Sequence, residues 1–210
     1  SVDKLMRARR SIFPEHYSGE AVSREALLRA MSAANWAPTH GKTEPWRFVV
    51  LMPAAFGTLQ EAKRRATSRL LAGSPEQLAA ALAKMERKAK QMDNVGALVA
   101  LCVKRVATAK GKLMPEWEET AAVSCCVQNL HLMLTAEGLA GYWSSGGVEG
   151  DCAWANALET RELLGMTGEC QGEADRVLGF FFVGVCSPES KAKYKARVCA
   201  RGGWGVRARG

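Results

Sequence analysis

The chain has 210 residues, of which 48% are hydrophobic and 24% charged, a length and composition that favour one globular domain and exclude a disordered chain. Its net charge of +8 comes almost entirely from residues 191–210, which hold seven basic and no acidic side chains. A nucleic-acid-binding protein usually carries its basic residues on a folded face, so we expect neither nucleic acid nor a membrane as a partner.

The apolar runs are much shorter than the roughly 20 residues that cross a membrane. We therefore expect a soluble protein in the cytoplasm, while an organellar location after removal of a presequence stays open. The number of cysteines is odd, none stands in a CxxC pair, and four lie in apolar runs. This pattern predicts reduced, mostly buried thiols and no metal site.

The first half of the chain predicts four helices and two strands. Residues 2–10 form a short helix, and 11–22 are irregular. Ser23 caps a helix that extends to about Trp36 and stops before Pro38. The run WRFVVLM at 46–52 predicts a strand buried on both faces.

Two charged helices are expected at 55–70 and 75–92, followed by a second buried strand at 97–106. The longest predicted helix covers 116–139. Its residues from 121 to 136 are apolar nearly all round, which predicts a central, fully buried helix.

A glycine-rich turn at 141–150, a helix near 155–166 and a third strand at 178–185 complete the prediction. Helices outnumber the scattered strands, so the fold class is α+β or mixed α/β. We find no repeat and no linker, and expect a single domain over 1–210 in which 191–210 is a basic extension.

Familiar catalytic motifs are absent. The sequence contains no HExxH, GxSxG, GxGxxG or GxxxxGK[ST], which argues against metalloproteases, serine hydrolases and common phosphate loops. His131 lies in the apolar helix and is interpreted as a hydrogen-bonded core histidine.

Three polar clusters near element ends are the candidate sites. Arg9, Arg10 and Ser11 offer donors suited to a phosphate, although basic residues also complement a helix C-terminus. The loop 37–46 carries several charged side chains and is otherwise a solvated turn. The segment 142–147 combines aromatic rings with glycines, which let a ligand approach the backbone, or it is a tight turn with a core aromatic.

The order of five motifs along the chain resembles the nitroreductase family, in particular its compact members. The motifs are RRS, AP-x-H-x-x-x-x-PW-x-F, a long apolar helix preceded by WE, GL-x-G-x-W-x-S-G and LG-x-x-x-x-G. The resemblance runs from Arg9 to Gly184. It implies a nitroreductase-like α+β fold with a central mixed or antiparallel sheet flanked by helices. It also implies FMN as cofactor, NAD(P)H as co-substrate, and an intertwined homodimer with the flavin at the subunit interface.

The resemblance implies a set of cofactor-binding residues and no catalytic side chain, since the chemistry would take place at flavin N5. They are Arg9, Arg10, Ser11, Trp36, His40, Lys42, Glu44, Tyr142, Trp143, Ser144, Gly146 and Gly147. In such enzymes the RRS stretch holds the FMN phosphate, and a basic residue after the last strand often helps; here that residue is one of Lys191, Lys193 and Arg197.

Glu44 and Lys42 depart from the family pattern, which usually has Gln and often Asn at these positions. A carboxylate near the flavin disfavours an anionic reduced form, whereas the lysine has the opposite effect.

Three functions remain open. The first is ping-pong reduction of nitroaromatics, quinones or similar small-molecule acceptors. The second is a non-reductase flavoenzyme of the same fold, such as a dehalogenase, a dehydrogenase or a flavin-cleaving enzyme. The third is a flavin-free binding module that uses the basic tail.

Overall fold

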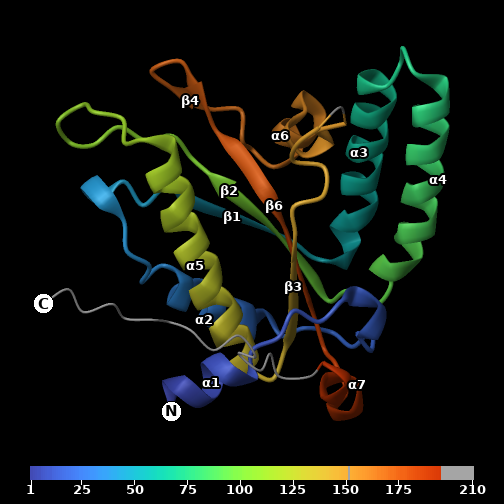
Figure 1. Cartoon of the computed structure of the whole chain (residues 1–210), viewed down its shortest axis with the longest axis vertical. Coiled ribbons are helices and arrows are strands. Elements are labelled where there is room, and N and C mark those ends of the chain that lie inside the picture. Colours follow the sequence, from blue (N-terminus) through green and yellow to red (C-terminus); the bar gives the residue numbers. More distant parts are fainter. Residues whose placement is uncertain (151, 195–210) are drawn as a thin grey trace, which may run out of the picture.

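The computed structural model describes residues 1–150 and 152–194 (Figure 1). Its centre is a four-stranded antiparallel sheet in the order β1-β2-β6-β3. The strands are β1 (Trp46–Leu51), β2 (Ala97–Val103), β3 (Ala140–Ser144) and β6 (Arg176–Gly184). β2 is buried throughout, and its Val99 pairs with Val50 on one side and Phe181 on the other.

Helices cover both faces of the sheet. On one face lie α2 (Arg24–Ala34) and α5 (Glu116–Ala136), and on the other lie α3 (Phe56–Leu70) and α6 (Leu158–Leu163). α4 (Pro75–Met92) packs beside α3 at the edge of the molecule and has no buried residue (Figure 1). Because side chains alternate along a strand, β2 and β6 supply both cores.

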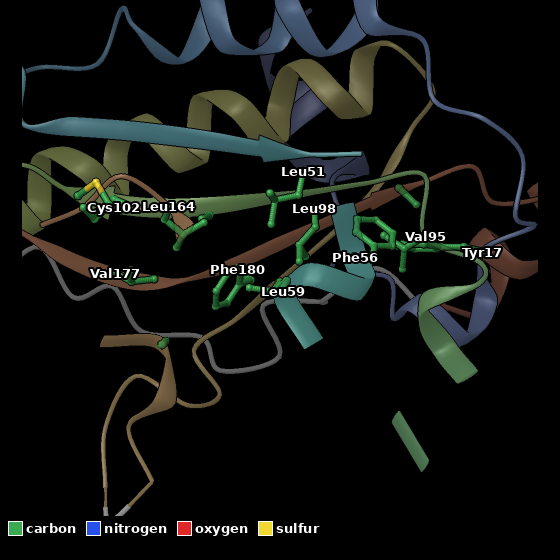
Figure 2. Packing of buried hydrophobic residues seen from close by; sticks show 14 of the residues in the cluster. Tyr17, Leu51, Phe56, Leu59, Val95, Leu98, Cys102, Leu164, Val177 and Phe180 are labelled. Carbon is green, nitrogen blue, oxygen red and sulfur yellow. The ribbon is translucent and has the colours of Figure 1, made fainter. Parts of the chain in front are cut away.

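The two cores differ in their members. Val99, Leu101 and Phe181 pack with residues of α2 and α5. Leu98 and Phe180 point to the opposite face and meet Leu59 of α3, an arrangement shown in Figure 2.

Short elements complete the chain. They are the helices α1 (Val2–Ala8) and α7 (Pro188–Lys193), the hairpin of β4 (Glu169–Cys170) and β5 (Glu173–Ala174), and the 3-10 turns Pro14–His16, His40–Lys42, Pro53–Ala55 and Trp154–Asn156. α1 lies against α5, and the segment that follows it forms a bridge between Ser11 and Gly141 of β3.

Most predicted helices are confirmed within a few residues. α2 starts after Ser23, whose Oγ accepts a hydrogen bond from the Ala26 N–H at 3.3 Å. The expected turn at 141–150 is wrong for its first part, because residues 140–144 form β3 on the edge of β6. The short hairpin and α7 were also not predicted. Residues 195–210, which include Arg197 and most of the basic extension, lie outside the described residues.

Two expectations about burial are wrong within the single chain. β1 is an edge strand, so Val50 is 38% exposed instead of buried. α5 is buried on one face only, because α2 and the sheet lie on that side. Its other face exposes a stripe of Ala121, Cys125, Gln128 and Ala136.

For the part of the chain that the structure describes, the thiols are free as predicted, but only half of them are buried. Cys102, Cys126 and Cys186 are buried, Cys125 is exposed, and all six described cysteines are free. Among the same residues, no group of three or more potential ligands could hold a metal ion. Residues 1–150 and 152–194 also contain no helix that is long and apolar enough to cross a bilayer.

Candidate functional site

A cavity of about 460 Å³ lies between α3, α4 and the face of the sheet that α3 covers. One end of it is walled by aromatic side chains from the N-terminal segment, β3, β6 and the turn at 154–156. These are Phe13, Tyr142, Trp154, Phe180 and Phe182. The Trp154 and Phe180 rings stack at 5.2 Å with an angle of 11° between their planes. Flat apolar surface of this kind suits an aromatic ligand.

The opposite wall of the cavity is positively charged. Lys63 of α3 and Lys84 and Lys88 of α4 line it, and none of them forms an ion pair with a carboxylate of the described residues. The Lys63 ammonium lies 4.7 Å from the centre of the Trp154 ring. Burial, followed by repulsion from Lys88, lowers the pKa of Lys63. The cavity therefore favours an electron-rich or anionic ligand.

Two glycines place bare main chain at the rim of the cavity. Gly147 has a φ of +86°, and a Cβ there would lie 1.8 Å from Nε1 of Trp154, so no other residue fits without moving that ring. The Gly146 N–H donates to Oγ of Ser144 at 3.3 Å. Gly146, Gly147 and Ser144, which belong to the third predicted cluster, all line the cavity.

The structure brings the first and third predicted clusters together. After α1 the chain runs beside β3, where the Ile12 N–H donates to the Gly141 carbonyl at 3.0 Å. The Phe13 ring then packs 4.6 Å from the Tyr142 ring at the cavity wall. Arg9, Arg10 and Ser11 therefore precede the wall directly.

Arg10 also has the structural role that was the alternative for this cluster. Its Nη1 donates to the carbonyls of Arg7 and Arg9 at the end of α1. Its Nε is buried without a hydrogen-bond partner among the described residues, so that N–H is a donor available to a ligand. Ser11 is exposed.

The second predicted cluster lies elsewhere. Trp36 is 86% exposed beside a shallow apolar groove that also includes Trp46 and Phe48. His40 bonds through Nδ1 to Glu118 at 2.7 Å. Neither residue lines the cavity described above.

The backbone of this loop is unusual. Lys42 and Glu44 have φ values of 55° and 44°, a region that costs free energy for residues other than glycine and recurs at functional sites. Both side chains are exposed, and within the described residues they do not pair with each other. No ion pair between Lys42 and Glu44 therefore neutralises the opposing effects that the two charges are expected to have on a reduced flavin.

α5 separates the two regions within one chain. Glu118, which holds His40, is in its first turn, and His131, which contacts Arg9, is 13 residues later. At a rise of 1.5 Å per residue this corresponds to roughly 20 Å. The loop 37–46 thus lies at the other end of α5 from Arg9.

Three further predicted residues have different surroundings. Trp143 points away from the cavity and packs in the core beneath α5, because it alternates with Tyr142 along β3. Lys191 donates to the Gly138 carbonyl at the end of α5, and Lys193 is exposed. Arg197 is outside the described residues.

Sequence reasoning missed several cavity residues. The alternation in the run GFFFVG places Phe180 and Phe182 on one face, which was a usable signal. No local sequence pattern identifies Lys63 or Trp154 as cavity residues, because their contact joins α3 to a turn about ninety residues later in the chain.

Comparison with known proteins decides the family. The family model described as "Nitroreductase family" matches residues 6–185. The chain belongs to the nitroreductase family. This confirms the resemblance found in the sequence, and with it the expected α+β fold.

Individual relatives of this nitroreductase-family chain agree. A Haemophilus influenzae protein named as an NAD(P)H nitroreductase is 29% identical over 178 residues, which cover 85% of this chain and 84% of the relative. The nitroreductase-like family protein of Bacillus cereus superposes with a TM-score of 0.67 at 20% identity, covering 89% and 86% of the two chains. The FMN-dependent nitroreductase of Mycobacterium smegmatis, solved with NADPH, gives a TM-score of 0.64 at 19% identity and coverage of 99% and 96%.

Proposed function

We propose that this protein is an FMN-dependent oxidoreductase that uses NAD(P)H to reduce a small-molecule acceptor. The observation that carries the proposal is a cavity lined by Tyr142, Ser144, Gly146 and Gly147, with the segment that follows Arg9, Arg10 and Ser11 paired to β3 beside it. Aromatic rings, bare glycine backbone and unpaired cations surround it in a chain of the nitroreductase family. Nitroaromatics and quinones are the acceptor classes that we infer, with the two substrates using the site in turn.

The residues present fit FMN. Arg9, Arg10 and Ser11 supply charged and hydroxyl donors for its phosphate, and the buried Nε of Arg10 is one such donor that bonds to none of the described residues. Tyr142 offers ring surface, and Gly147 keeps the rim of the cavity free of side-chain atoms.

When bound, FMN supplies hydride transfer at its N5 atom, a chemistry that no side chain provides. The protein's contribution is binding, orientation and electrostatics. The Gly147 amide lies at the cavity rim, where a backbone N–H can meet the edge of a ring. The wall formed by Lys63, Lys84 and Lys88 favours added negative charge. This division of labour explains the absence of a catalytic motif from the sequence.

The homodimer belongs to the same proposal. Loop 37–46 resembles a flavin-contacting segment of the family, yet it lies at the far end of α5 from Arg9. A second copy would bring its own loop to the cavity and complete the site. The exposed α5 stripe with Cys125 and the solvent-facing Trp36 supply apolar surface for that contact.

The visible spectrum of the protein, incubated with FMN and then given NADPH or NADH without oxygen, tests the function. We expect a flavin spectrum that bleaches, and regains its colour when a nitroaromatic or quinone is added. Bound flavin that stays oxidised would favour the non-reductase flavoenzymes of this fold. Protein that retains no FMN would refute the proposal. Sedimentation velocity of the same sample tests the dimer.

A further inference from the structure

His131 lies at the junction of α5, β3 and the segment that follows α1. It is 6% exposed, and its ring meets Phe181 edge-on at 4.9 Å with an interplanar angle of 80°. On another side the main chain of Gly141 comes so close that a Cβ there would be 3.2 Å from Cδ2 of His131. Packing therefore holds the imidazole in one orientation.

Both ring nitrogens of His131 are directed at two consecutive residues of the RRS stretch. Nδ1 is 3.3 Å from Nη1 of Arg9, and Nε2 is 3.1 Å from the carbonyl oxygen of Arg10. A guanidinium can only donate and a carbonyl can only accept, so Nδ1 is the acceptor and Nε2 carries the proton. The contacts thus specify a neutral imidazole in a single tautomer.

The electrostatic surroundings agree with this tautomer. Burial, together with the nearby positive charge of Arg9, lowers the pKa of His131 to about 4. The ring is therefore uncharged at neutral pH and keeps its acceptor nitrogen for Arg9.

We propose that His131 is a positioning residue that aligns Arg9 and the Arg10 main chain for the phosphate of FMN. The role rests on the proposed function, because it concerns the same cofactor site. Arg9 has five N–H donors in a rigid plane, and the bond from one of them to His131 helps to fix the orientation of the guanidinium. Orientation before binding raises affinity, because less side-chain freedom is lost when the ligand arrives.

Other contacts hold the neighbouring main chain without His131. The Ile12 N–H bonds to Gly141, and the Ile12 carbonyl accepts from the Tyr17 hydroxyl at 2.9 Å. The Phe13 N–H bonds to the hydroxyl of Tyr194 at 3.0 Å. Replacing His131 should therefore disturb Arg9 and Arg10 while the course of the chain stays the same.

Three substitutions separate the two hydrogen bonds. In His131→Asn the amide oxygen can take the place of Nδ1 and accept from Arg9. In His131→Gln the longer amide can place its NH₂ near the position of Nε2 and donate to the Arg10 carbonyl. His131→Leu keeps the volume and removes both bonds.

The measurement is the dissociation constant of each apoprotein for FMN and for riboflavin, obtained by titrating flavin fluorescence. Riboflavin lacks the phosphate, so the ratio of the two constants isolates the contribution of the phosphate site. We expect His131→Leu to lower the preference for FMN about tenfold and to leave riboflavin affinity within about twofold. His131→Asn should restore more of the preference than His131→Gln, since it keeps the bond to Arg9.

Leu134→Ala is the matched control. Leu134 is fully buried one turn later in α5, so its truncation destabilises the same helix without touching the arginines. Its FMN-to-riboflavin ratio should equal that of the wild type.

The outcomes are distinguishable. Equal weakening of both flavins in His131→Leu, or an unchanged ratio, would overturn the positioning role while leaving the oxidoreductase proposal intact. A wild-type protein that binds neither flavin would overturn the proposed function, and the role of His131 with it.

Discussion

The buried ion pair between Arg105 and Glu119 yields a quantitative prediction for stability. Both side chains are 2% exposed, and the pair ties the segment after β2 to the first turns of α5. Nη2 of Arg105 also donates to the Met114 carbonyl at 3.0 Å and lies 2.5 Å from Glu173, whose side chain is half exposed. Glu119→Leu would therefore leave a buried guanidinium with one partly hydrated carboxylate.

Loss of one member of a buried ion pair costs roughly 3–5 kcal/mol, and the remaining Glu173 places the expected loss near about 3 kcal/mol. Adding Arg105→Met removes the stranded charge, after which the main loss is the hydrogen bond to Met114, about 1 kcal/mol. We therefore expect the double variant to be about 2 kcal/mol more stable than Glu119→Leu alone.

Urea unfolding, followed by circular dichroism and tryptophan fluorescence, measures these differences. Glu116→Leu is the control, because Glu116 and its partner Arg176 are both about half exposed and such pairs contribute within roughly 1 kcal/mol. A double variant no more stable than Glu119→Leu would refute the reasoning, since the buried positive charge would then not be the source of the loss.

Three further predictions concern the site and its surroundings. The pKa of His131 is about 4 in the folded chain and 6.5 ordinarily, so between these pH values only the unfolded chain binds the proton; stability should fall by roughly 3 kcal/mol from pH 6.5 to pH 4. Denaturant unfolding at both pH values should show a loss that is larger in the wild type than in His131→Leu by roughly this amount, because carboxylates with a lowered pKa such as Glu159 lose stability in both proteins. Gly147→Ala should weaken FMN binding at least about tenfold, because the new methyl group displaces Trp154. Gly150 is the control, since it has a φ of +85° but open space around it. Gly150→Ala should therefore lose folding stability through its backbone conformation alone and bind FMN normally in the same titration. If a dimer covers the α5 stripe, Cys125→Ser should leave the number of thiols that react quickly with Ellman's reagent unchanged; loss of one fast thiol would contradict that interface.

Much of the fold was readable from local patterns. The cap at Ser23 and the apolar period predicted α2, and the short apolar runs predicted β1, β2 and β6. β3 was missed because its sequence contains a glycine and its strand geometry depends on pairing with β6. The prediction that α5 is fully buried was wrong for the single chain. A hydrophobic pattern shows which helix surface can be buried, but it does not show whether the same chain or another molecule covers that surface.

The site was predictable in its parts and not in its assembly. The RRS stretch and the segment ending in Gly147 were recognised as separate clusters by residue type and spacing. Their proximity depends on the bridge between Ser11 and Gly141, which no local pattern announces. The role inferred for His131 likewise needed the positions of both its ring nitrogens.

The sequence by itself determined the family, most helices, three of the four central strands and the residue types that a flavin phosphate and ring require. Those features follow from short-range periodicity and from motifs read in order. Only the tertiary structure decided that Phe13 and Tyr142 share one cavity wall while His40 lies at the other end of α5 from Arg9. Pairing between distant strands and packing across the sheet set these distances, and both depend on contacts between residues far apart in the chain.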